Sequence, residues 1–174
     1  MTTIATDALA HRLRTLLPTQ QSIEGTSNWC LFYSSEASNV AVIVAAWGDE
    51  MARAPNDRKL ALLYLANHIL QEGKRKGRLF GEEFAKVIVK GVRELLRTAD
   101  SKLRTPVTRV VRVWEERKVF GASVIKSLKE LLAKAEASAA ARGGQQGGGG
   151  SRKGEAAIDE ATRRKLQVGG RNLG

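Results

Sequence analysis

Residues 58–77, RKLALLYLANHILQEGKRKG, decide the fold of this chain. As a helix, the segment places one set of apolar residues on the same side, where they require a core: Leu62, Ala66, Ile69 and Leu70. A second set, three and four residues apart, shares the other side and is partly polar: Leu60, Tyr64, Asn67, His68 and Gln71. A helix that is apolar on most faces packs between neighbours. We therefore expect its remaining face to line a groove that holds a ligand.

A basic cluster, Lys74-Arg75-Lys76, ends this helix. Cations in a last turn offset the helix dipole, so a solvated helix end is one interpretation of the cluster. The other interpretation is attraction of an acidic ligand toward the neighbouring groove. The residues alone leave both open.

The rest of the body has apolar residues at helical spacing in six further segments. We expect these helices to begin at or near Asp7, Ser22, Ser38, Phe80, Thr105 and Gly121. The segment 80–98 is expected to be a single helix, and Pro106 to lie in the first turn of the next one. The β-branched run 40–47, VAVIVAAW, would suit a buried strand, but no second strand candidate exists to pair with it. Seven or eight short helices imply an all-α superhelical array.

Composition divides the chain into two parts. Apolar residues make up 43% of the sequence and fall almost entirely before Ala141, so we expect a helical domain over residues 1–141. Residues 142–174 form a basic tail with a glycine-rich start, which we expect to be flexible. The net charge is +11, and the residues before Arg142, with 22 basic and 15 acidic side chains, carry +7 of it. This charge predicts an acidic partner: nucleic acid, a phosphoprotein or a membrane surface.

Several classes of protein are disfavoured. The single cysteine, Cys30, allows no internal disulfide, which is typical of the cytosol or nucleus, and it is expected to be buried. We expect no secretory signal and no membrane span. His11 and His68 are the only histidines, and no spacing of His, Cys, Asp or Glu suits a metal site. We therefore expect no catalytic residues, no metal and no cofactor. Three tryptophans on apolar stripes are expected in the core: Trp29, Trp47 and Trp114.

Four segments together resemble a known family. They are TQQSI at 19–23, RKLALLYLAN at 58–67, KRKG at 74–77 and TPVTRVVRVWEERKVFG at 105–121. In this order they are similar to the domain that binds the C-terminal repeats of RNA polymerase II, as found in regulators of nuclear pre-mRNA and in termination factors. The resemblance covers about residues 8–132. It implies a right-handed superhelix of about eight helices with no enzymatic activity, acting in the nucleus in transcription termination or pre-mRNA 3′-end processing.

The resemblance also implies a ligand and a site. The ligand is the heptad YSPTSPS, usually phosphorylated on the serine after the tyrosine, and the groove lies between the second, fourth and seventh helices. By position, Tyr64 and Asn67 face the peptide and Arg109 takes the phosphate. An amide such as Asn67 both donates and accepts hydrogen bonds, and a guanidinium meets a phosphate with two parallel bonds. We add neighbouring peptide contacts at Leu60, His68, Gln71 and Ser22, and further phosphate contacts at Arg112, Lys74 and Arg75.

His68 departs from the family pattern, which has an aspartate that accepts a hydrogen bond from the ligand tyrosine. A neutral imidazole can accept through one ring nitrogen, whereas a protonated one cannot. We expect the chain to read a divergent repeat or to tolerate a modified tyrosine.

Other interpretations remain open at this point. Tyr64 and Asn67 could be interior polar residues satisfied by neighbouring helices, and Arg109 an ordinary solvated arginine. A membrane-trafficking adaptor that binds acidic lipids or sorting peptides is one alternative function, although we expect no membrane partner. RNA binding through the basic surface and tail is another. We expect a monomer.

Overall fold

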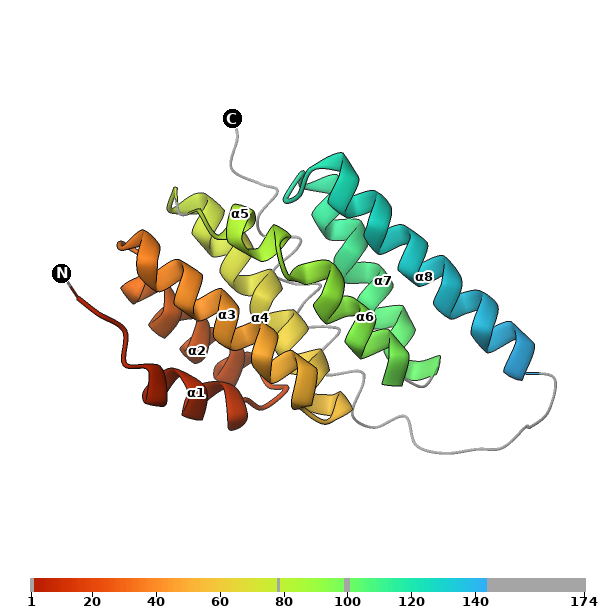
Figure 1. The fold of residues 1–174 in the computed structure, drawn as a ribbon, viewed down its shortest axis with the longest axis horizontal. Coiled ribbons are helices and arrows are strands. Elements are labelled where there is room, and N and C mark those ends of the chain that lie inside the picture. The colour runs from red at the N-terminus through yellow and green to blue at the C-terminus, as the bar shows by residue number, and fades with distance from the viewer. Residues whose placement is uncertain (1, 78, 99–100, 144–174) are drawn as a thin grey trace.

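The computed structural model describes residues 2–77, 79–98 and 101–143, and every regular element within them is a helix (Figure 1). The expected flexible tail lies outside the described residues from position 144 onward. The helices are α1 (Thr6–Arg14), α2 (Gln20–Tyr33), α3 (Ala37–Arg53), α4 (Asn56–Arg75), α5 (Phe80–Ala85), α6 (Ile88–Thr98), α7 (Ser101–Glu116) and α8 (Ala122–Arg142).

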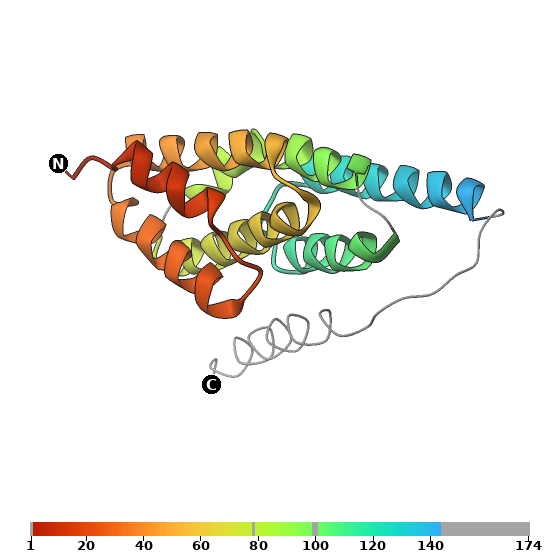
Figure 2. The same ribbon diagram turned by 90° about the horizontal axis from the view of Figure 1, so that it is seen from below.

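The helices stack in two layers (Figure 2). One layer runs through α3, α6 and α8, with α1 packed on α3. The other layer places α4 between α2 and α7. The short α5 contacts both α3 and α4. The predicted all-α superhelix is therefore confirmed, including the helix over the β-branched run 40–47.

Helix α4 has the two faces that its sequence predicts. The four apolar positions of the core side are buried. The five positions of the second set are all half-buried: Leu60, Tyr64, Asn67, His68 and Gln71. Since α4 lies between α2 and α7, this partly polar edge is within reach of both neighbours (Figure 2).

Trp47 anchors the contact between the two layers. Its side chain is 1% exposed, and its indole nitrogen donates a 2.7 Å hydrogen bond to the carbonyl of Leu62 on α4. The ring meets Phe84 edge-on at 5.3 Å between centroids. Gly91 on α6 lets the backbone approach so closely that an added Cβ would lie 2.7 Å from Trp47 Cη2.

The expected single helix over residues 80–98 is wrong, because the segment divides into α5 and α6. At the junction the backbone bonds shorten to three-residue spacing: Lys86 N donates to the Glu83 carbonyl and Val87 N to the Phe84 carbonyl. The tightened turn redirects the chain while both helices keep their apolar sides buried. The apolar pattern runs through the junction unchanged, so spacing alone does not mark it.

Two expected helix starts are also wrong. Pro106 lies inside α7, which already begins at Ser101, and its ring is buried. Burial of the ring offsets the backbone hydrogen bond that a proline cannot donate. At α2, the capping side chain belongs to Thr19, whose Oγ1 accepts from the backbone nitrogen of Ser22 at 3.3 Å. Ser22 Oγ instead accepts from the backbone nitrogen of Leu17 at 3.1 Å and secures the α1–α2 turn.

Two of the three tryptophans are buried and the third is half-buried. Trp47 and Trp114 are buried as expected. Trp29 is only half-buried, because its outer face is covered by the guanidinium of Arg12, 4.9 Å from the ring centre, rather than by a helix. Cys30 is fully buried, as predicted.

Candidate peptide-binding site

The half-buried edge of α4 is hydrogen-bonded to both neighbouring helices. On one side, His68 Nδ1 lies 2.8 Å from the hydroxyl oxygen of Ser27, a buried residue of α2. On the other side, the carboxamide oxygen of Asn67 accepts a 2.9 Å hydrogen bond from the indole nitrogen of Trp114 on α7. Adjacent residues of α4 thus fix the spacing between α2 and α7.

A chain of hydrogen bonds fixes which way two amide side chains of α4 point. Trp114 and Arg117 can only donate, so the Asn67 and Gln71 atoms that they contact must be oxygens. Arg117 donates to Gln71 Oε1 at 3.1 Å, and Gln71 Nε2 donates in turn to Asn67 Oδ1 at 3.4 Å. Lys74 Nζ completes the series with a 2.9 Å bond to the carbonyl of Arg117.

This orientation leaves the amide nitrogen of Asn67 available as a donor. Its oxygen is already engaged with Trp114 and Gln71, and Nδ2 has no hydrogen bond within the ranges that the structure describes. Asn67 is half-buried rather than enclosed. Because the oxygen of the same amide is already hydrogen-bonded, the side chain is ordered, and its nitrogen loses little entropy when it binds a carbonyl oxygen.

Arg109 and Arg112 are exposed on α7. Asn67 is hydrogen-bonded to Trp114, and Gln71, four residues later on α4, is hydrogen-bonded to Arg117, three residues after Trp114. The two chain segments therefore run in the same direction here. Arg109 precedes Trp114 by five residues, or about 7.5 Å along the helix axis. Arg109 therefore lies on α7 about one and a half turns before the level at which Trp114 meets Asn67.

The other predicted site residues lie on α4 and in the first turn of α2. Leu60 and Tyr64 extend the half-buried edge of α4 toward its N-terminus. Lys74 adjoins the site through Arg117, but Arg75 is paired with Glu72 at 3.0 Å. Arg75 is therefore part of a solvated helix end, which is one of the two interpretations that the sequence left open. Ser22 stabilises the turn before α2.

Three residues that support this site were not predicted from the sequence: Ser27, Trp114 and Arg117. Ser27 and Trp114 were missed because buried side chains on an apolar stripe give no polar signal. Arg117 could have been found from the sequence. It is a further cation of the family-like segment at 105–121, which also contains Arg109.

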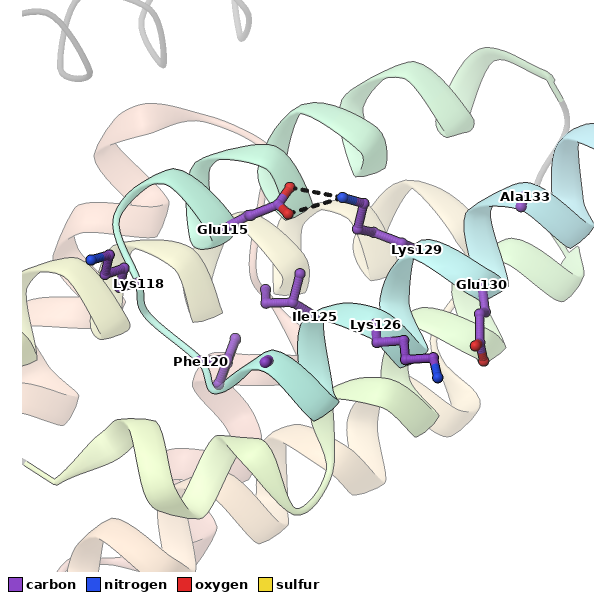
Figure 3. A pocket seen from close by; sticks show the side chains of 9 residues that line it. Glu115, Lys118, Phe120, Ile125, Lys126, Lys129, Glu130 and Ala133 are labelled. Atoms are coloured by element: carbon purple, nitrogen blue, oxygen red, sulfur yellow. Dashed lines mark hydrogen bonds and ion pairs between the residues drawn. The ribbon is translucent and has the colours of Figure 1, made fainter.

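A cavity of about 630 Å³ lies elsewhere, between α7 and α8 (Figure 3). Phe120 and Ile125 form part of its lining, and Lys129 on α8 bridges to Glu115 on α7 at 2.9 Å beside it. None of the predicted site residues lines this cavity. It is open and belongs to the packing of the last two helices.

Within residues 2–77, 79–98 and 101–143, no three His, Cys, Asp or Glu residues are grouped so as to hold a metal ion. None of the described helices is long and apolar enough to cross a membrane.

The helices of the described residues form an all-α superhelical domain. The chain belongs to the CID domain family, whose profile matches residues 7–128. The chain is 36% identical over 129 residues to regulation of nuclear pre-mRNA domain-containing protein 1B of human and mouse. It is 35% identical over 132 residues to human protein 1A. These matches cover 74% and 76% of this chain but only 39% and 41% of the relatives.

Solved structures agree on the fold. The CTD-interacting domain of Seb1 from Schizosaccharomyces pombe aligns with a TM-score of 0.64 at 21% identity, covering 78% of this chain and 99% of that one. The CID of Ctk3 aligns with the same TM-score at 14% identity, covering 76% and 93%. The family and the fold that the four sequence segments implied are therefore confirmed.

Proposed function

We propose that this chain binds the phosphorylated C-terminal repeats of RNA polymerase II and recruits a factor to the transcribing enzyme. Membership of the CID family supports the choice of ligand. The observation that carries the proposal is the Asn67 side chain, whose oxygen is used internally while its nitrogen stays available on the α4–α7 edge. A nuclear location and a role in termination or pre-mRNA 3′-end processing are part of the same proposal.

The peptide would be recognised in two parts. Its backbone carbonyls accept from Asn67 Nδ2, beside the half-buried Tyr64 and Leu60, which suit an aromatic ring. Its phosphate, with close to two negative charges, meets Arg109, with Arg112 one turn further on. Lys74, near the end of α4, adds positive field. Such a site is expected to bind in the micromolar range, about 8 kcal/mol.

His68 determines which residue we expect the chain to accept at the first position of the heptad, the position of the ligand tyrosine. Its ring is held by Ser27, so the position is ordered, but it offers an imidazole where the family has a carboxylate. We propose that the chain tolerates a modified or divergent first residue of the heptad, because a carboxylate that would repel a phosphate is absent.

The proposal is tested with two-repeat peptides, unphosphorylated or carrying one phosphate on the serine after the tyrosine. Arg109→Gln removes the phosphate contact, and we expect it to weaken phosphopeptide binding about tenfold while leaving the unphosphorylated peptide nearly unchanged. The matched control is Arg93→Gln, an exposed arginine of α6 in the other layer. Equal effects of the two variants would refute the assignment of Arg109.

A second variant separates the Asn67 donor from its structural role. Asn67→Asp keeps an oxygen for Trp114 but removes the donor nitrogen. We expect it to weaken both peptides, since both use the same backbone contact. A loss confined to the phosphopeptide would mean charge repulsion alone and would count against the donor role.

A further inference from the structure

We propose that Ser27 holds His68 as the neutral tautomer with its proton on Nε2, so that His68 donates a hydrogen bond to the first residue of the heptad. This inference rests on the proposed function and deepens it, because it names the chemistry that the site selects. The ligand is a peptide whose first side chain accepts a hydrogen bond and need not donate one. Ser27 is then a positioning residue, and His68 sets the specificity.

The hydroxyl group of Ser27 is enclosed in the protein and has one partner. Ser27 is 0% exposed, and its Oγ lies 2.8 Å from His68 Nδ1. Ser34, a buried serine at the end of the same helix, donates its proton to the carbonyl of Leu31 at 2.7 Å. Among the residues that the structure describes, Ser27 Oγ makes no such bond to a carbonyl. Its proton therefore has only the imidazole as an acceptor.

This single contact determines where the imidazole proton lies. A buried O–H group needs an acceptor, so the Ser27 hydroxyl donates to Nδ1, and Nδ1 carries a lone pair. In a neutral imidazole the proton is then on Nε2. A protonated ring, or the opposite tautomer, would direct an N–H at the Ser27 oxygen and leave the serine proton without an acceptor. The tautomer is thus assigned from the hydrogen-bond partners.

The orientation of the ring places Nε2 on the ligand side. The two nitrogens of an imidazole point in diverging directions, and Nδ1 is turned to the interior at Ser27. Because Ser27 is enclosed and His68 is half-buried, the edge of the ring that carries Nε2 faces away from the core. Tyr64 and Gln71 share this partly polar edge of α4. His68 therefore presents an N–H group beside the proposed peptide contacts.

The assignment determines which ligand groups His68 recognises. The nitrogen that is able to accept is used by Ser27, so a hydroxyl proton on the ligand finds no acceptor on this ring. A tyrosine oxygen still accepts from Nε2–H, and so does an oxygen of a phosphorylated tyrosine. A phenylalanine offers no acceptor. We therefore expect the site to bind tyrosine and its O-modified forms and to disfavour phenylalanine.

The first test reads the tautomer in the full chain without peptide. Two-bond ¹H–¹⁵N NMR spectra at mildly alkaline pH distinguish a ring nitrogen that carries a proton from one that does not. We expect the His68 proton on Nε2 in the wild type. Ser27→Ala removes the hydroxyl donor and should abolish that preference, whereas Ser34→Ala, the matched buried serine, should keep it. A proton on Nδ1 in the wild type, or an unchanged tautomer in Ser27→Ala, would overturn the assignment.

The second test places two side chains of the same shape at the first position of the singly phosphorylated heptads. O-methyltyrosine keeps an acceptor oxygen without a proton, and 4-ethylphenylalanine lacks that oxygen. We expect the wild type to bind the O-methyltyrosine peptide about fivefold more tightly than the other. His68→Asp, whose carboxylate accepts but does not donate, should show no such preference. Ser27→Ala should lose part of the preference, and Ser34→Ala should retain it.

The remaining outcomes separate this inference from the proposed function. If the wild type prefers tyrosine to phenylalanine but binds the two matched side chains equally, the ligand hydroxyl donates to His68 and the inference is overturned. If it distinguishes neither pair, His68 does not contact the first residue, and the inference fails while peptide binding stands. If no peptide binds the wild type, the proposed function fails with the specificity, and the spectra of the free chain alone decide the tautomer.

Discussion

The indole nitrogen of Trp114 and the carboxamide oxygen of Asn67 are joined by a 2.9 Å hydrogen bond between α7 and α4. Trp114 is fully buried, so its N–H has no access to water and depends on this acceptor. The same bond turns the Asn67 nitrogen away from the interior. One contact therefore serves both the packing of the two helices and the presentation of a donor.

Removing that acceptor should destabilise the domain. In Asn67→Ala the buried indole N–H loses its partner, and we expect a loss of about 1–3 kcal/mol in the free energy of unfolding. Urea denaturation measures it. Asn67→Asp retains the acceptor and should lose less. Equal stability of Asn67→Ala and the wild type would mean that the Trp114 bond contributes nothing.

Two glycine-to-alanine changes should act in opposite directions. In Gly91→Ala the new methyl group would lie 2.7 and 2.9 Å from Trp47 Cη2 and Cζ3. Trp47 cannot easily move, because it is bonded to Leu62, so we expect a cost of about 1–3 kcal/mol. Gly25 of α2 has nothing within 4 Å of the added carbon, so Gly25→Ala should stabilise by up to about 1 kcal/mol. Thermal unfolding of both variants tests the pair, and a stabilised Gly91→Ala would contradict the packing described here.

Cys30 should be unreactive in the folded protein. Burial raises the pKa of its thiol to about 12, against a smaller lowering by Arg12, so no thiolate forms near pH 8. We expect iodoacetamide to label the protein only in denaturant, as read by mass spectrometry. Because the unfolded thiol ionises near pH 9 and the folded one does not, Cys30 should also favour unfolding as pH rises above that value. Cys30→Ala should lack this component, and rapid labelling without denaturant would contradict the burial.

His68→Asp tests the tyrosine preference. The carboxylate can still accept from the Ser27 hydroxyl, so the domain should fold. We expect the variant to bind the standard singly phosphorylated heptad more tightly than the wild type does, by about threefold to tenfold for one added hydrogen bond to a charged group. Fluorescence anisotropy with labelled peptides gives the ratio. If the aspartate variant binds no better, His68 does not set the preference.

The sequence predicted the faces of α4 because helical spacing alone determines which side chains share a side. All five positions of the polar edge are half-buried, as their spacing indicated. The sequence could not predict the hydrogen bond between Asn67 and Trp114. The two residues are 47 positions apart, and their contact depends on how α7 is placed along α4. The division into α5 and α6 was missed for a similar reason. Phe84 and Ile88 continue the apolar pattern on either side of the turn at Lys86 and Val87, and only tertiary packing requires that turn.

The most direct measurement of the central claim follows two side chains during one titration. With the singly phosphorylated two-repeat peptide, we expect the Asn67 side-chain amide and the Arg109 guanidinium resonances to shift together in NMR spectra, along a single binding curve in the micromolar range. The α6 resonances of Arg93 should stay in place. Binding that shifts Arg109 but leaves the Asn67 amide unchanged, or two curves with different affinities, would contradict the claim that α4 and α7 form one site.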